Sequence, residues 1–470
     1  MTERPDRPLR IAVVGAGPAG VYTADILTKE ERDFRVSIDL FDRYPAPFGL
    51  IRYGVAPDHP RIKGIVNALH KVMDRGDIRF LGNVDVGTTV SLEDLRRLYD
   101  VVVFTTGAVK DAELDVPGVE LEGSFGGADF ASWYDGHPDV PREWTLDAQS
   151  VAVIGNGNVA LDVARILSKH ADDLLVTEIP DNVYQALKAS PVTDVHVFGR
   201  RGPAQIKFTP LELRELAHSR DVDIVLYEED FDFDAASEQA IEENNQVRTM
   251  VGTLTNWLME QEDRTEQASR RLHLHFLQAP EAFLDEDGDG RLDKLRMRRM
   301  ELDGQGGITA TDDTVDYDVQ AVYRAVGYFG SPVEGVEFDD VRGVIPNAEG
   351  RVLDAQGQPV PGLYTSGWIK RGPVGLIGST KGDSLETIKH LIEDEPGLYT
   401  AQDPSEDAIL DLLTERGVEY TTWEGWQALD AHERSLGAAA TQAGPVERER
   451  VKVVDREEMT RISRAGAGLA

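Results

Sequence analysis

The sequence predicts an α/β fold that contains two strand–turn–helix segments of the same design. In the first, the apolar run 11–14 leads into a glycine turn over 15–20, and residues 18–29 can continue as a helix. In the second, the strand-like run 150–154 leads into a turn over 155–160 and a helical segment over 158–169. Because order and spacing agree, the chain is predicted to carry two dinucleotide-binding (Rossmann-like) folds.

The glycines of the first turn have separate tasks. Gly15 allows the tight turn, Gly17 lets a pyrophosphate approach the backbone, and Gly20 lets the helix pack closely on the strand. A second strand over 36–41 ends on Asp42, whose carboxylate is placed to accept a hydrogen bond from a ribose hydroxyl. The alternative is a plain glycine-rich turn, but the flanking strand and helix favour a nucleotide site.

The second segment ends differently. Its turn contains Gly155 and Gly157, and the next strand, 195–198, is followed by Arg200 and Arg201 where the first segment has a carboxylate. Two guanidinium groups would form forked, charge-assisted hydrogen bonds with a 2′-phosphate. The second site is therefore predicted to prefer NADP over NAD. A surface arginine pair at a strand end is the alternative.

Length and composition indicate a globular protein of more than one domain. The chain has 470 residues, of which 41% are hydrophobic and 28% charged, which suits two or three domains. No uninterrupted apolar stretch is long enough to span a bilayer. Asp25 interrupts the only run that could imitate a signal peptide, and no small-residue cleavage site follows it. We therefore expect a cytoplasmic protein.

The balance of acidic and basic residues limits which binding partners are expected. Lysine and arginine number 49 against 84 aspartates and glutamates, for a net charge of -35. This excess repels nucleic acid and anionic membranes, so neither is an expected partner. It can equally serve to solvate the surface. An acidic protein partner would need a local basic patch.

The chain contains no cysteine. A redox-active disulfide, a cysteine-ligated iron–sulfur cluster and a catalytic thiol are therefore excluded within it. Two nucleotide folds, one closed by an acid and one by an arginine pair, imply a bound flavin dinucleotide, an exchangeable nicotinamide and hydride transfer between them. The electrons could then pass to a one-electron carrier, to a quinone, or to oxygen and an organic substrate.

One acidic loop resembles a metal site. Residues 285–290 copy the opening of a calcium-binding loop, but Arg296 stands where that loop requires a glutamate, and no helices flank it. We interpret it as a polar turn that joins strands over 272–284 and 294–302. No metal site is expected.

Further segments are predicted from local pattern. A helix is expected over 62–74, and another over 384–392 after a glycine-rich lead-in, with its positive end directed at a ligand. The tail from residue 393 is expected to carry no chemistry, and Trp423 and Trp426 are expected to pack in a core.

Several longer motifs together resemble the adrenodoxin reductase family, and within it the bacterial ferredoxin–NADP reductases. These motifs lie at 47–60, 155–165, 199–203, 208–215 and 367–373, in the family's order. The resemblance covers nearly the whole chain. It implies an FAD-binding domain made of residues 1–108 and 326–470, with an NADP-binding domain over 109–325 inserted into it.

The resemblance also implies site residues. Together with the glycine turns, it places FAD on Gly15, Gly17, Ala19, Gly20, Asp42, Leu50, Trp368, Gly375, Leu376 and Ile377. It places NADP(H) on Gly155, Gly157, Asn158, Val159, Arg200, Arg201 and Glu212. His59, Asp162 and Glu215 fall near the nicotinamide and flavin rings and are the catalytic candidates. His59 could relay a proton or donate a hydrogen bond, and a purely structural histidine is the alternative.

The implied activity is transfer of a hydride from NADPH, followed by release of electrons one at a time to a ferredoxin. Alternatives are a flavoprotein subunit of a larger complex, like the small subunit of glutamate synthase, and a flavin monooxygenase. The family docks its acidic iron–sulfur partner on a basic surface, yet 228–232 and 242–243 are acidic here. A basic patch would have to come from residues such as Arg52, Arg61, Lys63, Lys370 and Arg371.

Overall fold

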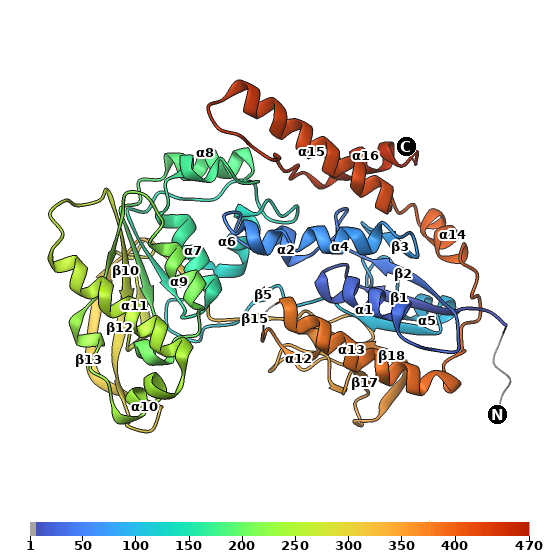
Figure 1. Cartoon of the computed structure of the whole chain (residues 1–470), viewed down its shortest axis with the longest axis horizontal. Helices are drawn as coiled ribbons and strands as arrows, with labels where there is room; N and C mark the ends of the chain where they lie inside the picture. Colours follow the sequence, from blue (N-terminus) through green and yellow to red (C-terminus); the bar gives the residue numbers. More distant parts are fainter. Residues whose placement is uncertain (1–5, 376, 470) are drawn as a thin grey trace. The chain divides into compact units, whose positions relative to one another are not determined.

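The computed structural model describes residues 6–375 and 377–469, with only the backbone for Ile377 (Figure 1). The chain divides into two compact units. Unit 1 consists of Met1–Lys110, Asp135–Asp139 and Tyr328–Ala470, and unit 2 consists of Asp111–Tyr134 and Val140–Gly327. A two-residue strand, β5 (Lys110–Asp111), lies where the chain first leaves unit 1.

Unit 1 is built on a mainly parallel sheet. The strands of unit 1 are β1 (Leu9–Val14), β2 (Val36–Phe41), β3 (Ile78–Leu81), β4 (Val101–Phe104), β15 (Tyr328–Phe329), β16 (Asn347–Ala348), β17 (Arg351–Leu353) and β18 (Pro359–Thr365), and all of them except β15 belong to this sheet. Its helices are α1 (Pro18–Lys29), α2 (Leu50–Tyr53), α3 (Pro60–Lys63), α4 (Val66–Met73), α5 (Leu92–Leu98), α12 (Trp368–Arg371), α13 (Ile377–Asp394), α14 (Ala408–Glu415), α15 (Trp423–Ala443) and α16 (Arg456–Gly466). Among the described residues, the main sheet has the order β16-β17-β18-β4-β1-β2-β3.

Both faces of this sheet are covered. Strand β1 pairs in parallel with β2 and β4, and its residues are buried throughout. Ile11 and Val13 belong to a core cluster with residues of α1, α4, α13 and α15, whereas Ala12 and Val14 belong to another with residues of α5 and α14. Because alternate side chains of a strand point to opposite faces, a continuous apolar run indicates burial on both sides.

Unit 2 has a parallel sheet of its own. The strands of unit 2 are β6 (Ser124–Gly126), β7 (Ser150–Ile154), β8 (Asp194–Phe198), β9 (Val222–Val225), β10 (Arg270–His275), β11 (Gln278–Leu284), β12 (Lys294–Leu302), β13 (Ile308–Asp318) and β14 (Ala321–Arg324). Its helices are α6 (Gly127–Tyr134), α7 (Asn158–Ser168), α8 (Asp181–Ala189), α9 (Pro210–Leu216), α10 (Ala235–Glu243) and α11 (Asn245–Glu262). The described strands form one sheet of order β6-β14-β7-β8-β10-β9 and a second of order β11-β12-β13.

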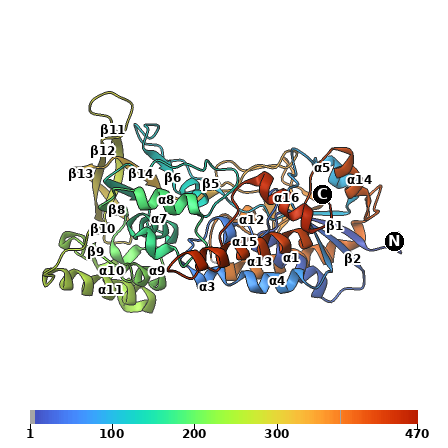
Figure 2. The ribbon, with the colours of Figure 1, turned by 90° about the horizontal axis from the view of Figure 1, so that it is seen from above.

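The smaller, antiparallel sheet covers part of the parallel one. Leu295 and Met297 of β12 pack in one cluster with Ile154 and Phe198 at the ends of β7 and β8. Figure 2 shows β11–β13 and the helices α10 and α11 at opposite ends of unit 2. The parallel sheet thus lies between layers of different kinds.

The structure corrects several predicted boundaries. The single strand expected over 272–284 is two strands in different sheets, β10 and β11, because the chain turns at Phe276 and Leu277, where φ of Leu277 is +53°. The helix expected over 62–74 is interrupted after Lys63, and the helix expected from residue 384 begins at Ile377. Strands β11 and β12 do pair as a hairpin, as predicted.

Other expectations agree with the structure. The loop after β11 is a polar turn, since Asp285 accepts hydrogen bonds from the amides of Gly288 and Gly290. Trp423 and Trp426 lie in the core of unit 1. Within residues 6–375 and 377–469, none of the helices combines the length and the apolar character that a membrane crossing requires.

Candidate functional site

The turn between β1 and α1 leaves room only for glycine. Gly15 has φ of +108°, and a Cβ on it would lie 2.6 Å from the carbonyl oxygen of Thr105. A Cβ on Gly20 would lie 1.9 Å from the carbonyl oxygen of Gly15. Gly17 is the N-cap of α1 and no side chain caps the helix. The amides at this helix start can therefore receive an anionic group such as a pyrophosphate.

Asp42 follows β2 and lies beside this turn. Its Oδ2 accepts a hydrogen bond from the amide of Ala16, and its Oδ1 accepts one from the amide of Tyr44, each at 2.9 Å. Burial raises the pKa of Asp42 to about 6. An ionised carboxylate has about four acceptor positions, so it can still accept from a ribose hydroxyl.

The proline- and glycine-rich loop after Asp42 rests on the same turn. The amide of Phe48 donates to the carbonyl of Ala16 at 2.9 Å, and a Cβ on Gly49 would lie 3.1 Å from the Cα of Gly17. The loop then forms α2, which begins at Leu50, and His59 is the buried N-cap of α3. The loop path thus brings Leu50 close to the first glycine turn.

A buried ion-pair network, which no pattern in the sequence indicates, holds this loop. Arg52 of α2 donates two hydrogen bonds to Glu433 of α15, at 3.0 and 2.5 Å. Lys452 donates to the carbonyl oxygens of Arg52 and Asp135, at 2.6 and 2.9 Å. Lys63 donates to the carboxylate of Asp135 at 3.1 Å. The tail, for which no chemistry was predicted, therefore fixes the loop that carries Leu50.

The glycine-rich lead-in to α13 is part of unit 1. Gly367, with φ of +80°, precedes Trp368, the first residue of α12. Gly375 has φ of +85°, and α13 begins two residues later at Ile377 with no acidic residue in its first turn. Leu376 lies outside the described residues. The earlier start brings the positive end of α13 next to Gly375 rather than to residue 384.

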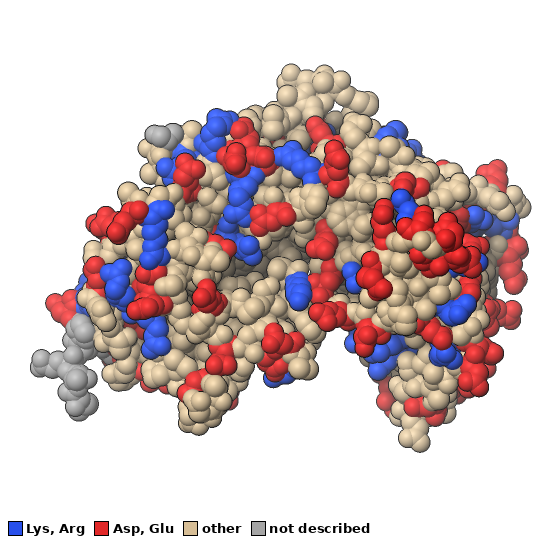
Figure 3. Space-filling model, turned by 180° about the vertical axis from the view of Figure 1, so that it is seen from behind, with Lys and Arg blue, Asp and Glu red and all other residues tan. Residues whose placement is uncertain are grey.

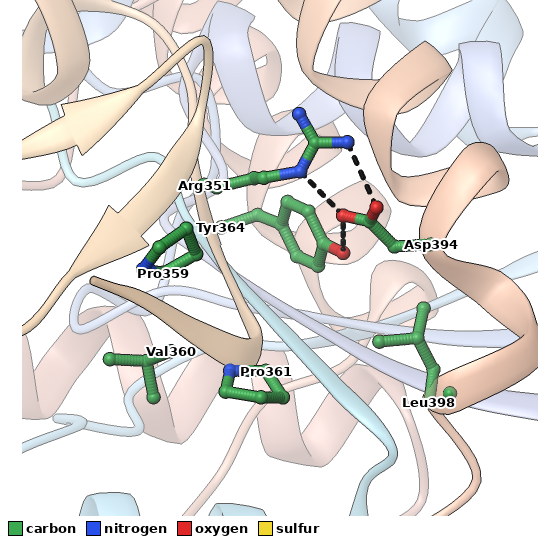
Figure 4. Close-up of a pocket in the computed structure, with 8 residues that line it drawn as sticks. Arg351, Pro359, Val360, Pro361, Tyr364, Asp394 and Leu398 are labelled. Carbon is green, nitrogen blue, oxygen red and sulfur yellow. Dashed lines mark hydrogen bonds and ion pairs between the residues drawn. The ribbon is translucent and has the colours of Figure 1, made fainter.

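A pocket on another part of unit 1 has no glycine turn leading into a helix among its lining residues. It is lined by Pro359, Val360, Pro361 and Leu398 together with Arg351 and Tyr364 (Figure 4). Arg351 and the Tyr364 hydroxyl both donate to Asp394, at 2.6 and 2.8 Å. The polar groups of this pocket therefore serve to join β17 and β18 to the end of α13.

The turn between β7 and α7 in unit 2 repeats the first. A Cβ on Gly155 would lie 2.3 Å from the carbonyl oxygen of Ala325, whereas a Cβ on Gly157 would meet no described atom within 4 Å. No side chain caps α7 at Gly157. Asn158, the first residue of α7, accepts a hydrogen bond from the amide of Thr209 at 3.0 Å and so ties α9 to this turn. Val159 follows it and is half-buried.

Arg200 and Arg201 follow β8, as the sequence predicts. Arg200 is exposed and Arg201 is half-buried. None of the residues that the structure describes forms a hydrogen bond or an ion pair with either guanidinium group. Positive charge without a protein counter-ion at the end of this strand suits a phosphate ligand.

The acidic candidates of unit 2 are linked through an arginine that sequence reasoning did not assign a role. Asp162 of α7 accepts a hydrogen bond from the fully buried Arg165 at 2.8 Å, and Arg165 lies 3.8 Å from Glu212 of α9. Only the spacing of Asp162 and Arg165, three residues apart on a helix, could have indicated it. Glu215 is half-buried on α9. His59 belongs to unit 1 and these acids to unit 2.

A family model described as pyridine nucleotide-disulphide oxidoreductase matches residues 9–195. The mitochondrial NADPH:adrenodoxin oxidoreductase of Arabidopsis thaliana is 36% identical over 446 residues, with 92% of each chain covered. NADPH-ferredoxin reductase FprA of Mycobacterium tuberculosis is 37% identical over 470 residues, with 97% of this chain and 99% of the relative covered.

The chain belongs to the adrenodoxin reductase family. The solved structure of M. tuberculosis FprA in complex with NADPH has a TM-score of 0.87 and 37% identity, and covers 97% of this chain and 100% of that one. The two Rossmann-like folds predicted from the glycine turns are thus confirmed. The disulphide in the family model's description has no counterpart here, because the chain lacks cysteine.

In this member of the adrenodoxin reductase family, some of the residues that could have formed a basic patch are not available at the surface. Arg52 and Lys370 are buried, and carboxylates neutralise both: Glu433 pairs with Arg52, and Glu386 with Lys370. The side chain of Lys63 is 11% exposed and pairs with Asp135. On the face drawn in Figure 3, lysine and arginine side chains are interspersed with carboxylates.

Proposed function

We propose that this chain is an FAD-dependent reductase that takes a hydride from NADPH and passes electrons one at a time to a ferredoxin. The observation that carries the proposal is the contrast between the two nucleotide turns. The first is followed by the buried carboxylate of Asp42, and the second by Arg200 and Arg201, which have no counter-ion among the described residues. The relatives are named as NADPH-ferredoxin and adrenodoxin reductases, which supports the same activity.

Unit 1 is proposed to hold FAD. The uncapped start of α1 would receive the pyrophosphate on the amides near Gly17, Ala19 and Gly20, and Asp42 would accept from the ribose. Leu50, Trp368, Gly375 and the stretch through Leu376 and Ile377 would contact the remainder of the cofactor. FAD, when bound, accepts a hydride and can release electrons singly.

Unit 2 is proposed to hold NADP(H). The absence of any described atom within 4 Å of a Cβ on Gly157 leaves space for a pyrophosphate beside the start of α7. Asn158 and Val159 would lie next to it. Arg200 and Arg201 would bind the 2′-phosphate through forked hydrogen bonds. This charge arrangement selects the phosphorylated nicotinamide cofactor.

His59, Asp162 and Glu215 are proposed to position the reacting rings. His59 is 3% exposed and its backbone is fixed, because its carbonyl accepts hydrogen bonds from the amides of Ile62 and Lys63. Arg165 orients the carboxylate of Asp162 through its hydrogen bond. Hydride transfer depends chiefly on placement, so rigid side chains suit this task. Glu212, near Arg165, is assigned to the nicotinamide nucleotide.

The partner is proposed to be a ferredoxin and the compartment the cytoplasm. A ferredoxin supplies the one-electron metal centre that a chain without cysteine cannot build with thiolates.

The test is stopped-flow spectroscopy of the purified flavoprotein. NADPH is expected to bleach the flavin absorption quickly, NADH slowly, and ferredoxin is expected to restore it in single-electron steps. Fast restoration by air that depends on an organic substrate, with no response to ferredoxin, would instead identify a monooxygenase. An absence of flavin bands in the purified protein would reject the proposal at the outset.

A further inference from the structure

Three histidines gather on one face of the parallel sheet in unit 2. His273 and His275 are alternate residues of β10, and His196 of the neighbouring β8 is the register partner of His273. Side chains two residues apart on a strand point to the same face, and directly paired residues of neighbouring strands do so too. The proposed NADP(H) reaction uses none of these three side chains.

Their ring nitrogens are close together. Nδ1 of His196 lies 3.0 Å from Nε2 of His275. One nitrogen from each of the three rings lies within 4.8 Å of the other two. Zinc–nitrogen bonds are about 2.0–2.1 Å long, so two ligand nitrogens on a tetrahedral zinc are roughly 3.3 Å apart. The pair from His196 and His275 is already near this separation. The His273 ring stacks on His196, with centroids 4.3 Å apart and an interplanar angle of 12°, so it must rotate out of this stack to direct a nitrogen at the same ion.

The third histidine has the outer partner that metal-binding histidines usually have. Nε2 of His273 lies 2.9 Å from Asp194, whose carboxylate also accepts from Arg271 and Thr193. With two other donors on it, this carboxylate acts as an acceptor, and it accepts the Nε2–H of His273. A carboxylate on the far nitrogen fixes the tautomer and leaves the other nitrogen as a lone-pair donor. That nitrogen, Nδ1 of His273, now accepts from the Tyr227 hydroxyl at 2.8 Å.

Aromatic side chains enclose the histidines. His275 is buried, and Phe198 stacks on it with ring centroids 4.6 Å apart. Neutral imidazole is the form that binds metal ions. Tyr317 of β13 packs edge-on against His275, with ring centroids 5.1 Å apart, while 12% of the His273 side chain is exposed and provides access.

We propose that His196, His273 and His275 form a binding site for one divalent transition-metal ion of the zinc type. The three imidazoles supply three nitrogen ligands, and a water molecule takes the fourth position after the Tyr227 hydroxyl leaves Nδ1 of His273. The proton that now lies between His196 and His275 moves to the other nitrogen of its own ring, so each ring stays neutral. Nitrogen ligands favour zinc and its neighbours over magnesium and calcium.

The site would strengthen the strand ends that precede Arg200 and Arg201. The carbonyl of His275 accepts a hydrogen bond from the amide of Gly199, at 2.9 Å, directly before the arginine pair. A metal ion that joins β8 to β10 at this point would hold Gly199 in place. We therefore assign the ion a structural task rather than a part in hydride transfer.

The test is equilibrium dialysis of the flavoprotein against zinc chloride with magnesium in excess, followed by elemental analysis. The wild-type chain and the control His218→Gln, which changes an exposed histidine of the same unit, are expected to hold one more zinc per chain than the double variant His196→Gln/His275→Gln. At free zinc about 100 times Kd, the unfolding equilibrium constant of the wild type should fall about 100-fold. Equal zinc content in all three proteins, or no zinc in the wild type, would overturn the proposal.

A second measurement does not depend on the folding of a variant. X-ray absorption at the zinc edge of the loaded wild-type protein counts the histidine ligands. Three imidazoles with one oxygen ligand are expected. A spectrum with mainly oxygen ligands would show that zinc binds elsewhere, such as at the carboxylates of the 285–289 loop, and would reject the histidine site.

Discussion

Replacing Glu433 with glutamine should destabilise unit 1 far more than loss of one surface charge would. The Glu433 side chain is fully buried. Its Oε1 accepts from Arg52 and from the amide of Val453, and its Oε2 accepts from Arg52 again. A glutamine has one acceptor oxygen, so in either orientation its NH2 group faces a donor. The buried guanidinium of Arg52 then keeps its charge without a full partner.

The size of this effect follows from burial. Removing one partner of a buried ion pair costs about 3–5 kcal/mol, because the other charge stays desolvated. Glu449→Gln is the matched control: this side chain is 68% exposed and pairs with Arg434 at 2.8 Å and with Arg450 at 3.8 Å. An exposed pair contributes about 0–1 kcal/mol. The loss of unfolding free energy should therefore be severalfold larger for Glu433→Gln than for Glu449→Gln.

Urea unfolding of the flavoprotein, followed by the fluorescence of released flavin, reports on unit 1. Because a chain with two units need not unfold in one step, midpoints are compared rather than extrapolated free energies. With urea m values of about 1–3 kcal/mol per molar, the loss of about 3–5 kcal/mol should lower the midpoint of Glu433→Gln by roughly 1–5 M. FAD should also dissociate more readily, since Arg52 and Leu50 share α2. Equal midpoints for Glu433→Gln and Glu449→Gln would refute the reasoning.

Three further perturbations test the nucleotide turns. Arg200→Ala or Arg201→Ala should raise the KM for NADPH roughly 10- to 150-fold in steady-state kinetics and leave that for NADH unchanged, since a hydrogen bond to a charged group contributes about 1.5–3 kcal/mol. Gly20→Ala should yield protein without flavin absorption, because the added methyl would lie 1.9 Å from the carbonyl oxygen of Gly15. Asp42→Asn should alter the pH dependence of apoprotein stability. The native pKa of Asp42, about 6, exceeds the unfolded value, so the ionised carboxylate destabilises the fold and protonation relieves this. Between pH 6 and 4.5 the free energy of unfolding of the wild type should therefore rise by about 1.5 kcal/mol relative to the variant, as denaturant titrations at each pH would measure.

Each of these predictions has a control and an outcome that contradicts it. Arg220→Ala removes an exposed arginine that pairs with Asp173 and should change neither KM. Gly252→Ala, where a Cβ meets no described atom within 4 Å, should keep its flavin, and flavin retained by Gly20→Ala would show that the turn can adjust. A stability difference between wild type and Asp42→Asn that does not change between pH 6 and 4.5 would contradict the raised pKa.

The parts of the fold that are set by residues close together in the sequence were predictable. The strand–glycine–helix segments at Gly15 and Gly155 are fixed by local sterics, because a positive φ and a close carbonyl exclude any side chain. The contrast between Asp42 and the arginine pair is equally visible in the sequence. Boundaries were less predictable: one apolar run became β10 and β11, because the reversal at Leu277 has no glycine or proline to mark it.

What the sequence by itself determined is therefore the two nucleotide turns and the charge that follows each. Only the tertiary structure decided which charged residues remain at the surface. In the sequence, Arg52 and Lys370 look like basic surface residues. In the fold both are buried, and carboxylates neutralise them: Glu433, far away in the sequence, pairs with Arg52, and Glu386 pairs with Lys370. The link from Asp162 through Arg165 to Glu212, and the histidines of β8 and β10, likewise arise only when separate strands and helices pack together. Charge pairing and metal-binding geometry depend on distances in space, and these are set by packing rather than by local sequence.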